Sequence, residues 1–157
     1  MRVIAGTLKG RRLADVGKGD ASAHLRPTPD RVRESLFSIL THLGRVSEAR
    51  VLDLFAGTGA LGIEALSRGA EEVLFVDNGR VASKLIAENI AITGLDGRAR
   101  LLRQDILRLG PCSDAPFDLV FLDPPYGKEL GATAIADLRQ GGWFAPDALI
   151  VWEDNSV

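Results

Sequence analysis

The four residues Asp123-Pro124-Pro125-Tyr126 are the part of this sequence whose types and order point most directly to chemistry. They follow the apolar run 117–122, so they should form the loop after a buried strand. Two consecutive prolines fix the backbone and remove two N–H donors, which leaves a rigid loop with bare carbonyl acceptors. The Asp123 carboxylate and the Pro124 carbonyl can therefore accept both N–H bonds of one planar amino group.

Such a clamp suits methyl transfer to an exocyclic amino group of a nucleic-acid base. The lone pair of that nitrogen is delocalised into the ring, so two acceptors are needed to pull it toward tetrahedral geometry and to stabilise its developing charge. Alignment of nitrogen, methyl group and sulfur contributes the rest of the acceleration of methyl transfer. The ring of Tyr126 offers a face on which the base can stack. For Pro-Pro alone we would favour a stiff turn, but in this context we predict that Asp123, Pro124, Pro125 and Tyr126 are catalytic.

A glycine-rich loop indicates an adenosine-type ligand. Gly57, Gly59 and Gly62 fit G-x-G-x-x-G after an apolar run, and Asp77 follows Gly57 by twenty positions. Glycines let the backbone turn tightly and let a ligand approach closely, while an acid at the end of the next strand can accept hydrogen bonds from ribose hydroxyls. This fingerprint fits a nicotinamide dinucleotide as well as S-adenosylmethionine.

Two further carboxylates favour S-adenosylmethionine. Asp53 lies four residues before the glycines, where a carboxylate suits a cationic sulfonium amino acid better than a pyrophosphate. Asp105 ends a third predicted strand and can accept the adenine amino group. The alternative for both acids is that they cap helix starts or loops.

Strands and helices alternate along most of the chain. Strands are predicted at 51–55, 72–77, 99–103, 117–122 and 148–152, and helices at 29–43, 60–68, 80–93 and 129–139. This order predicts parallel βαβ units with right-handed crossovers, hence an α/β, Rossmann-like, doubly wound sheet with helices on both faces. Ligands of such sheets bind beyond the carboxyl ends of the strands, where the candidate residues fall.

The first helix has clear end signals. Thr28 can cap it, Pro29 suits its first position and Gly44 ends it. Its apolar residues fall on one helical face, which we expect to be buried: Val32, Leu36, Ile39, Leu40 and Leu43.

Residues 1–28 differ from the rest of the chain. Residues 2–5 and 11–14 are predicted to pair as a hairpin around the turn 6–10. Residues 1–50 contain ten Lys and Arg against five acids, a charge of +5, and the remainder carries −7. This asymmetry predicts an anionic partner on one side. We therefore expect residues 1–28 to be a basic, RNA-facing extension of the same domain, and residues 29–157 to be the catalytic part.

The bulk composition is that of one globular domain. The chain has 157 residues, of which 46% are hydrophobic and 25% charged. It contains no apolar run long enough to span a bilayer and no apolar signal core at its N-terminus, and its one cysteine, Cys112, excludes an intramolecular disulfide. These features predict a cytoplasmic protein without membrane contact. His24, His42 and Cys112 lack metal-ligand spacing, so no metal is predicted.

Two sets of motifs resemble known enzymes. D-L-F-A-G-T-G-A-L-G-I-E-A-L-S-R-G-A and F-D-L-V-F-L-D-P-P-Y are similar to class I amino-methyltransferases. R-V-I-A-G-x-x-K-G-R-x-L and L-R-P-T-P-D-R-V-R-E-S-L-F resemble a narrower group, the bacterial enzymes that methylate N2 of a guanine in 16S ribosomal RNA. The match runs over nearly the whole chain, but the D-P-P-Y motif is shared with adenine-N6 and cytosine-N4 enzymes.

The resemblance implies roles for individual residues. S-adenosylmethionine would be held by Asp53, Phe55, Gly57, Thr58, Gly59, Asp77, Asn78, Asp105 and Ile106. Lys9, Arg11 and Arg12 would meet RNA phosphates, while Arg26, Thr28 and Arg31 would lie near the active-site entrance. The implied partner is 16S ribosomal RNA, free or within the small subunit or an assembly intermediate, and we expect a monomer. The family's sheet continues with a two-strand hairpin that this sequence lacks, so residues 148–152 should form an apolar sheet edge.

Three other functions compete with this one. A DNA adenine or cytosine amino-methyltransferase would normally carry a large target-recognition insert, for which this chain has no room. A nicotinamide-dependent oxidoreductase could use the same glycine loop, but no acid or base for a hydride site is evident. A non-catalytic RNA-binding module would have no use for D-P-P-Y.

Overall fold

The computed structural model describes residues 1–15, 28–124 and 128–153 of the chain. Its helices are α1 (Asp30–His42), α2 (Ala60–Ser67), α3 (Arg80–Thr93) and α4 (Lys128–Gln140), with a short 3-10 helix, η1 (Ile106–Arg108). Its strands are β1 (Arg50–Leu54), β2 (Glu72–Val76), β3 (Ala99–Leu102), β4 (Phe117–Leu122) and β5 (Phe144–Trp152). The predicted alternation of strands and helices is confirmed.

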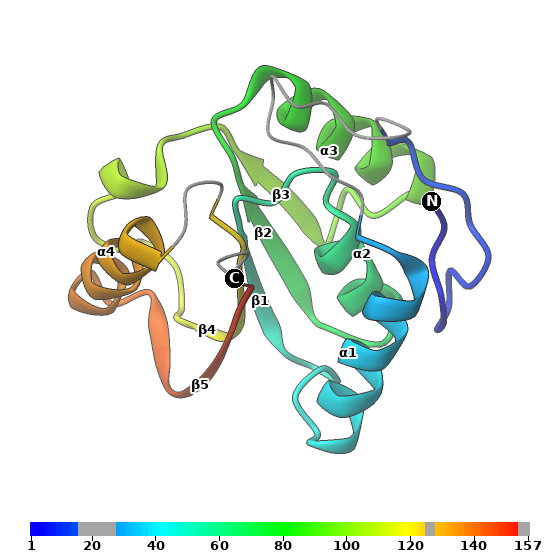
Figure 1. Ribbon diagram of the computed structural model, residues 1–157, viewed down its shortest axis with the longest axis horizontal. Coiled ribbons are helices and arrows are strands. Elements are labelled where there is room, and N and C mark those ends of the chain that lie inside the picture. Colours follow the sequence, from blue (N-terminus) through cyan, green and yellow to red (C-terminus); the bar gives the residue numbers. More distant parts are fainter. Residues whose placement is uncertain (16–27, 125–127, 154–157) are drawn as a thin grey trace.

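The five strands form one parallel sheet in the order β3-β2-β1-β4-β5 (Figure 1). The chain runs outward from β1 to β3 and then returns to place β4 on the other side of β1, which creates a switch point between β1 and β4. The expected Rossmann-like, doubly wound sheet is therefore confirmed. Among the described residues β5 is an edge strand, as the sequence predicts for 148–152.

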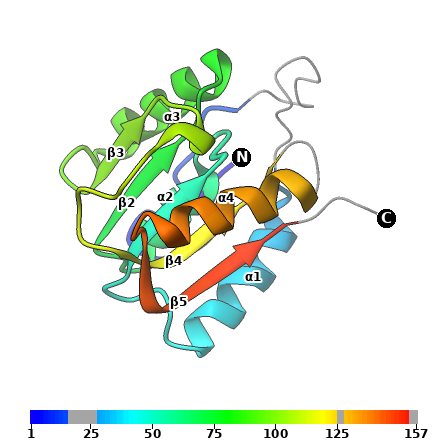
Figure 2. The same cartoon turned by 90° about the vertical axis from the view of Figure 1, so that its left-hand side faces the viewer.

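Helices cover both faces of the sheet (Figure 2). One hydrophobic cluster joins α1, α2 and α3 to one face through residues such as Phe37, Ile63 and Ile86. The other cluster joins α4 to the opposite face through Ala134 and Leu138. Side chains alternate across a strand, so in β1 Leu52 and Leu54 face α4.

The buried face of α1 is not the predicted one. Its buried residues are Arg33, Phe37 and Leu40, whereas Val32, Ile39 and Leu43 are 47%, 60% and 56% exposed. Only Leu40 of the predicted set is fully buried, and Leu36 is partly buried. The prediction was wrong because it used the apolar positions alone, while Arg33 turns inward to an ion pair with Glu64.

The start of α1 also differs from the prediction. The helix begins at Asp30 with Pro29 in the capping position, and no side chain caps it. Thr28 offers its backbone carbonyl to Arg33 Nε at 3.4 Å instead. Gly44 follows the helix end with a φ of +69°, in agreement with its predicted role as a stop signal.

The N-terminal segment pairs back on itself more sparsely than a full hairpin. Arg2 and Arg12 form one antiparallel bridge, and the Val3 and Leu13 N–H groups donate to the carbonyls of Arg11 and Met1, both at 2.9 Å. Val3 and Leu13 are buried in the cluster that covers α2. The segment is thus part of the packed core.

β5 is longer than predicted. It spans nine residues and contains Pro146, which cannot donate to a sheet ladder and is tolerated because β5 lies at the edge. A register shift between Phe117 and Leu119 accommodates its first half. No helix in the described ranges is long and apolar enough to cross a membrane.

Candidate active site

Four acids gather where the parallel strands end. Asp53 is near the end of β1, and Asp77, Asp123 and Glu153 directly follow β2, β4 and β5. The carboxyl ends of parallel strands meet at one edge of a sheet, and here that edge includes the switch point between β1 and β4. Three of these acids were predicted; Glu153 was not. Its sequence signal was the same as for Asp77 and Asp123: an acid immediately after a buried strand.

Asp53 is a buried acid with little to compensate its charge. Its side chain is 3% exposed, and one carboxylate oxygen accepts the Gly62 N–H at 3.1 Å. Burial raises the pKa of Asp53 well above its ordinary value; the Gly62 bond opposes this, and the negative charges of Asp77 and Asp123 add to it. A cation near Asp53 would reverse the effect, so the site suits a positively charged ligand group.

The glycine loop between β1 and α2 is shaped for close packing. Gly59 caps α2 with a φ of +81°, which favours glycine. A Cβ on Gly62 would lie 2.4 Å from the Phe75 ring, so only glycine lets α2 approach β2 this closely. The Gly57 N–H donates to Asp77 at 3.1 Å, which links the loop to the end of β2.

Asp77 keeps acceptor capacity beyond this loop contact. Its other oxygen accepts the Gly79 N–H at 2.8 Å, and each carboxylate oxygen has a second lone pair. The neighbouring Asn78 is exposed. Ribose hydroxyl groups could therefore still donate to Asp77.

The remaining predicted cofactor residues are spread along the same edge. Phe55 adopts a φ of +55°, which is uncommon outside glycine. Thr58 is buried, and its carbonyl accepts a bond from Asn89 Nδ2 at 2.9 Å. Asp105 caps η1 by accepting the Leu107 N–H at 3.0 Å, so the capping alternative holds for this acid at least in part.

The catalytic loop is described as far as Pro124. Asp123 is half-buried and Pro124 is buried. Burial, followed by the charge of Glu153 and a side-chain hydrogen bond with it, raises the pKa of Asp123 to about 7. Pro125 and Tyr126 lie outside the described residues, as does Arg26.

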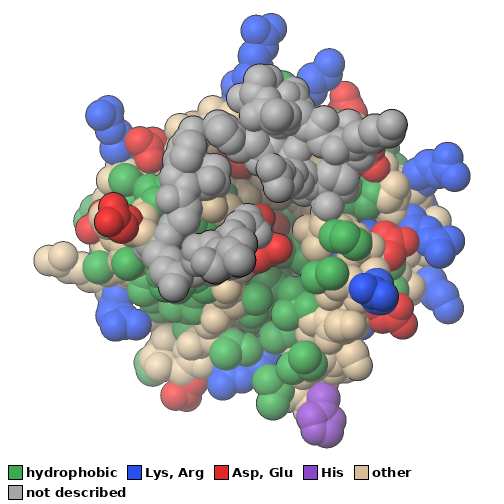
Figure 3. Space-filling model, in the orientation of Figure 1, with side chains coloured by type: hydrophobic (Ala, Val, Ile, Leu, Met, Phe, Trp, Pro, Cys, Tyr) green, Lys and Arg blue, Asp and Glu red, His purple; other side chains and the backbone are tan. Residues whose placement is uncertain are grey.

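An apolar cavity of about 220 Å³ adjoins Asp123 and Glu153. Its walls come from the residues before α1, from α1 and α2, and from the ends of β4 and β5: Thr28, Val32, Leu36, Leu61, Phe121, Leu122 and Val151. Figure 3 shows acidic side chains near the centre of this face, beside hydrophobic ones between α1 and β5. Two acids at the rim of an apolar hollow could hold the polar edge of a flat, otherwise apolar group.

The predicted RNA-contacting residues lie at the surface. Lys9, Arg11, Arg12 and Arg31 are exposed. Arg11 is partly engaged, because its guanidinium donates to the Ile92 carbonyl at 2.7 Å. Arg12 lines a cavity of about 480 Å³ with Met1, Arg2, Leu13, Asp15 and Asp30.

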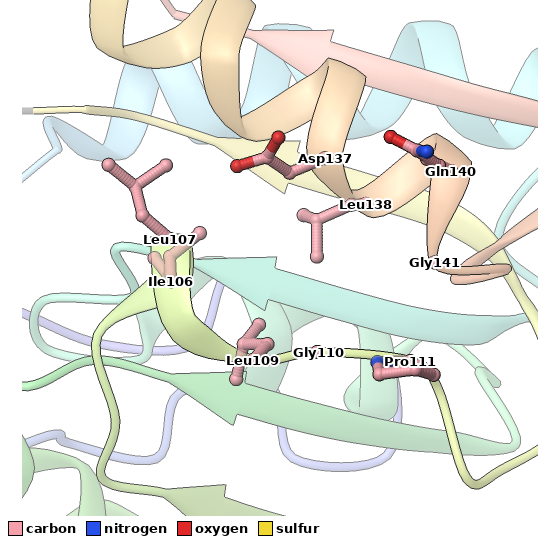
Figure 4. A pocket seen from close by; sticks show the side chains of 9 residues that line it. All are labelled: Ile106, Leu107, Leu109, Gly110, Pro111, Asp137, Leu138, Gln140 and Gly141. Atoms are coloured by element: carbon pink, nitrogen blue, oxygen red, sulfur yellow. The ribbon is translucent and has the colours of Figure 1, made fainter.

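Ile106 belongs to a different hollow, of about 300 Å³, between η1 and α4 (Figure 4). Leu107, Leu109 and Leu138 line it together with the polar Asp137 and Gln140. Ile106 itself is buried and packs in the α4-side cluster. Sequence reasoning did not single out this hollow. No group of three or more metal-ligating side chains occurs among residues 1–15, 28–124 and 128–153.

Known proteins match this chain along its whole length. The family model described as "Conserved hypothetical protein 95" covers residues 1–157. The ribosomal RNA small subunit methyltransferase D of Escherichia coli is 39% identical over 99% of this chain and 75% of that protein. The protein of the same name from Haemophilus influenzae is 37% identical over 98% of this chain and 78% of its own length.

Solved structures agree with the sequence matches. An Escherichia coli protein described as a methyltransferase superposes with a TM-score of 0.81 at 38% identity, covering 97% of this chain and 80% of that one. A Haemophilus influenzae protein described as a methylase gives a TM-score of 0.77 at 32% identity, covering 100% and 84% of the two chains.

Proposed function

The chain belongs to the family described as conserved hypothetical protein 95, and from that premise we propose that it is an S-adenosylmethionine-dependent methyltransferase acting on N2 of a guanine in 16S ribosomal RNA. One observation carries the proposal. Asp53 is a buried acid that pairs with no cation among the described residues, and it lies at the same strand-end edge as Asp123 of the D-P-P-Y loop. A cationic methyl donor beside Asp53 and a target amine beside Asp123 would thus be neighbours.

The residues around Asp53 fit S-adenosylmethionine. When bound, this cofactor supplies a methyl group on a positively charged sulfur. Asp53 would attract the cationic amino-acid end, Asp77 would accept the ribose hydroxyls, and Asp105 would accept the adenine amino group. Phe55, Gly57, Thr58, Gly59, Asn78 and Ile106 complete the proposed set.

Asp123 and Pro124 would hold the target amine. Their oxygens accept its two N–H bonds, and the charge on Asp123 stabilises the positive charge that grows on nitrogen during attack. The apolar wall beside Asp123 would lower the local dielectric constant once a base fills the cavity, which would strengthen this electrostatic effect. Pro125 would keep the loop rigid, and Tyr126 would stack on the base.

The assignment to 16S ribosomal RNA rests on the relatives and on the N-terminal motifs. The Escherichia coli and Haemophilus influenzae relatives carry ribosomal RNA small subunit in their names. Lys9, Arg11 and Arg12 would contact phosphates, while Arg26, Thr28 and Arg31 would border the entrance. The protein would work as a cytoplasmic monomer, on free RNA or on an assembling small subunit, without a metal.

The test is methylation with a labelled methyl donor. Purified protein is incubated with S-adenosylmethionine and either naked 16S RNA or small subunits from cells that lack the enzyme, and the RNA is mapped by mass spectrometry. We expect one N2-methylguanine. Asp123→Asn should greatly slow the reaction, while Asp114→Asn, at an exposed acid paired with Arg100, serves as the matched control. Methylated adenine or cytosine, or no methylation of either substrate, would contradict the proposal.

A further inference from the structure

Glu153 is an acid in the candidate site to which the proposed mechanism gives no role. It follows β5 as Asp123 follows β4, and Leu122 is in register with Trp152, so the two acids continue neighbouring strands at the same level. The Glu153 N–H donates to the Leu122 carbonyl at 2.9 Å, which extends the ladder by one bond. Because neighbouring strands lie about 4.8 Å apart, the backbone places Glu153 beside Asp123.

Both acids line the apolar cavity of about 220 Å³. The other described residues of its lining are apolar except Thr28. Asp123 is half-buried and Glu153 is exposed, and within the described ranges Glu153 forms no ion pair with a Lys or Arg. A flat base that enters with its amino group at Asp123 would therefore present the next atom of its polar edge to a carboxyl group that no cation neutralises.

The bases that carry an exocyclic amino group differ at the ring atoms beside it. In guanine one of these atoms, N1, carries a hydrogen and is a donor. In adenine and cytosine the ring nitrogen beside the amino group carries only a lone pair and is an acceptor. An ionised carboxylate has only acceptor oxygens, so a carboxylate next to the amine clamp is matched by guanine and by neither of the other two bases.

We propose that Glu153 is a specificity-determining residue whose carboxylate accepts the N1–H of the target guanine while Asp123 and Pro124 hold its amino group. The inference rests on the proposed function, because it takes the methylated atom to be N2 of a guanine. It supplies a physical reason for guanine that the D-P-P-Y motif, shared with adenine and cytosine enzymes, does not contain.

The cost of a wrong base follows from the same contact. With adenine or cytosine in this pose, Glu153 would face a ring lone pair, and both acceptors would lose water without gaining a hydrogen bond. Sites built to hydrogen-bond an N–H reject analogues that lack it far more strongly than apolar pockets reject a missing methylene group. Asp123 cannot make this distinction, because the amino group that it holds is common to all three bases.

The base analogue 2-aminopurine isolates the N1 contact. It keeps the amino group at C2 but has a lone pair in place of the N1–H. The substrate is the 16S RNA or small subunit in which wild type methylates a mapped guanine, prepared with guanine or 2-aminopurine at that position. Single-turnover rates are measured on both at saturating S-adenosylmethionine. Because 2-aminopurine also lacks O6, the decisive quantity is how the preference for guanine changes between protein variants.

Wild type should methylate the guanine substrate at least about 100-fold faster than the 2-aminopurine substrate. Glu153→Ala should slow the guanine reaction about 10–100-fold and leave the 2-aminopurine rate within a few fold of wild type. Glu153→Gln loses the charge but has an amide that can donate to a ring lone pair. It should slow the guanine reaction about tenfold and methylate 2-aminopurine no more slowly than wild type does. The preference for guanine should thus shrink at least about tenfold in both variants.

Two other substitutions serve as controls. Asp123→Asn should slow both substrates alike, since it acts on the amino group that they share. Glu88→Gln, at an exposed acid on α3, should change neither rate. The affinity of both Glu153 variants for S-adenosylmethionine should stay within a few fold of wild type, which calorimetry measures and which separates a lost base contact from a damaged fold.

Two results would overturn the role of Glu153. One is equal slowing of the guanine and 2-aminopurine substrates in both Glu153 variants, and the other is an unchanged guanine rate. Either would leave the proposed function standing, because wild type would still produce N2-methylguanine. If wild type methylates an adenine or a cytosine instead, the proposed function fails and the inference fails with it.

Discussion

Asp53 and Glu64 are two buried carboxylates with opposite surroundings. Glu64, on α2, is 0% exposed, and it accepts bonds from the Ile4 and Ala5 N–H groups and from the guanidinium groups of Arg33 and Arg68. Asp53, on β1, is 3% exposed and accepts one backbone N–H. A buried charge is stable only when it is paired and hydrogen-bonded. Glu64 has such partners within the fold, whereas Asp53 has no ion-pair partner among the described residues, as a site that we propose for a cationic ligand would require.

The network around Glu64 connects the N-terminal segment to the body. Arg33, which is 0% exposed, also donates to the Arg2 carbonyl at 2.8 Å and to Asp30 at 2.5 Å. Asn89 adds a second connection, because it exchanges two hydrogen bonds with the Ala14 backbone and donates to the Thr58 carbonyl. The Glu64 and Arg33 side chains thus hold the N-terminal segment against the body of the domain, whereas Asp53 belongs to the site that we propose for a ligand.

The largest effect on the free energy of unfolding should come from removing the paired charge of Glu64. Glu64→Gln leaves Arg33 buried with an incomplete partner, so the free energy of unfolding should drop by about 3–5 kcal/mol. Urea unfolding measures this. Glu72→Gln is the matched control, since Glu72 pairs with Arg50 and Arg100 near the surface and should cost about 1 kcal/mol or less. Equal losses for the two variants would show that the buried network of Glu64 stabilises the fold no more than a surface ion pair does.

Asp123→Asn should act on rate and leave the fold intact. The variant keeps one acceptor oxygen but loses the charge, so the single-turnover rate should fall about 10²–10³-fold while S-adenosylmethionine affinity stays within a few fold. Tyr126→Ala should instead weaken RNA placement by roughly 1–3 kcal/mol. A wild-type rate for Asp123→Asn would reduce D-P-P-Y to a stiff turn.

The same Asp123 substitution should stabilise the protein, with a defined pH dependence. The pKa of Asp123 is about 7 in the folded chain, against an ordinary value of 3.8, so ionisation favours the unfolded state as pH rises through this interval. The free energy of unfolding of Asp123→Asn should therefore exceed that of wild type by about 1–2 kcal/mol above pH 7, after allowance for partial exposure. Near pH 4 the difference should vanish. Urea unfolding at several pH values measures it, and a constant difference across this range would contradict the raised pKa.

The smallest effect is expected for the exposed basic residues of the N-terminal segment, and it concerns the salt dependence of RNA affinity. If Lys9 and Arg12 contact phosphates, each change to Ala should reduce the slope of log affinity against log salt by about 1. Arg11 already donates to the Ile92 carbonyl, so Arg11→Ala should change the slope less. Filter binding of 16S RNA at several salt concentrations tests this, with cofactor affinity as the control. Unchanged slopes would mean that these side chains are only solvated.

The sheet and most of the site follow from local patterns. The apolar runs of strand length, the helix stop at Gly44 and the acids just after strands can all be recognised from residues close in sequence. Because the carboxyl ends of parallel strands meet at one edge of a sheet, the strand positions alone predict that Asp53, Asp77 and Asp123 lie near one another.

What sequence reasoning missed depends on long-range partners. Arg33 is buried because it pairs with Glu64, thirty-one positions away, and no helical periodicity encodes that partner. Glu153 becomes informative only once β5 is paired with β4 and its carboxyl meets Asp123. Asp105 has a capping role in η1 that periodicity could not separate from ligand binding.

The most direct test is calorimetry of S-adenosylmethionine binding to wild type and to Asp53→Asn, in buffers of different ionisation enthalpy. A cation beside Asp53 should lower its raised pKa. Wild type should therefore release a proton on binding and bind more tightly as pH rises toward the raised pKa of Asp53 in the free protein. Asp53→Asn should release fewer protons, lose about 10–100-fold in affinity at the pH where wild type binds most tightly, and unfold no more easily than wild type. Unchanged affinity and proton release in Asp53→Asn would contradict the claim that this uncompensated acid is the cation site.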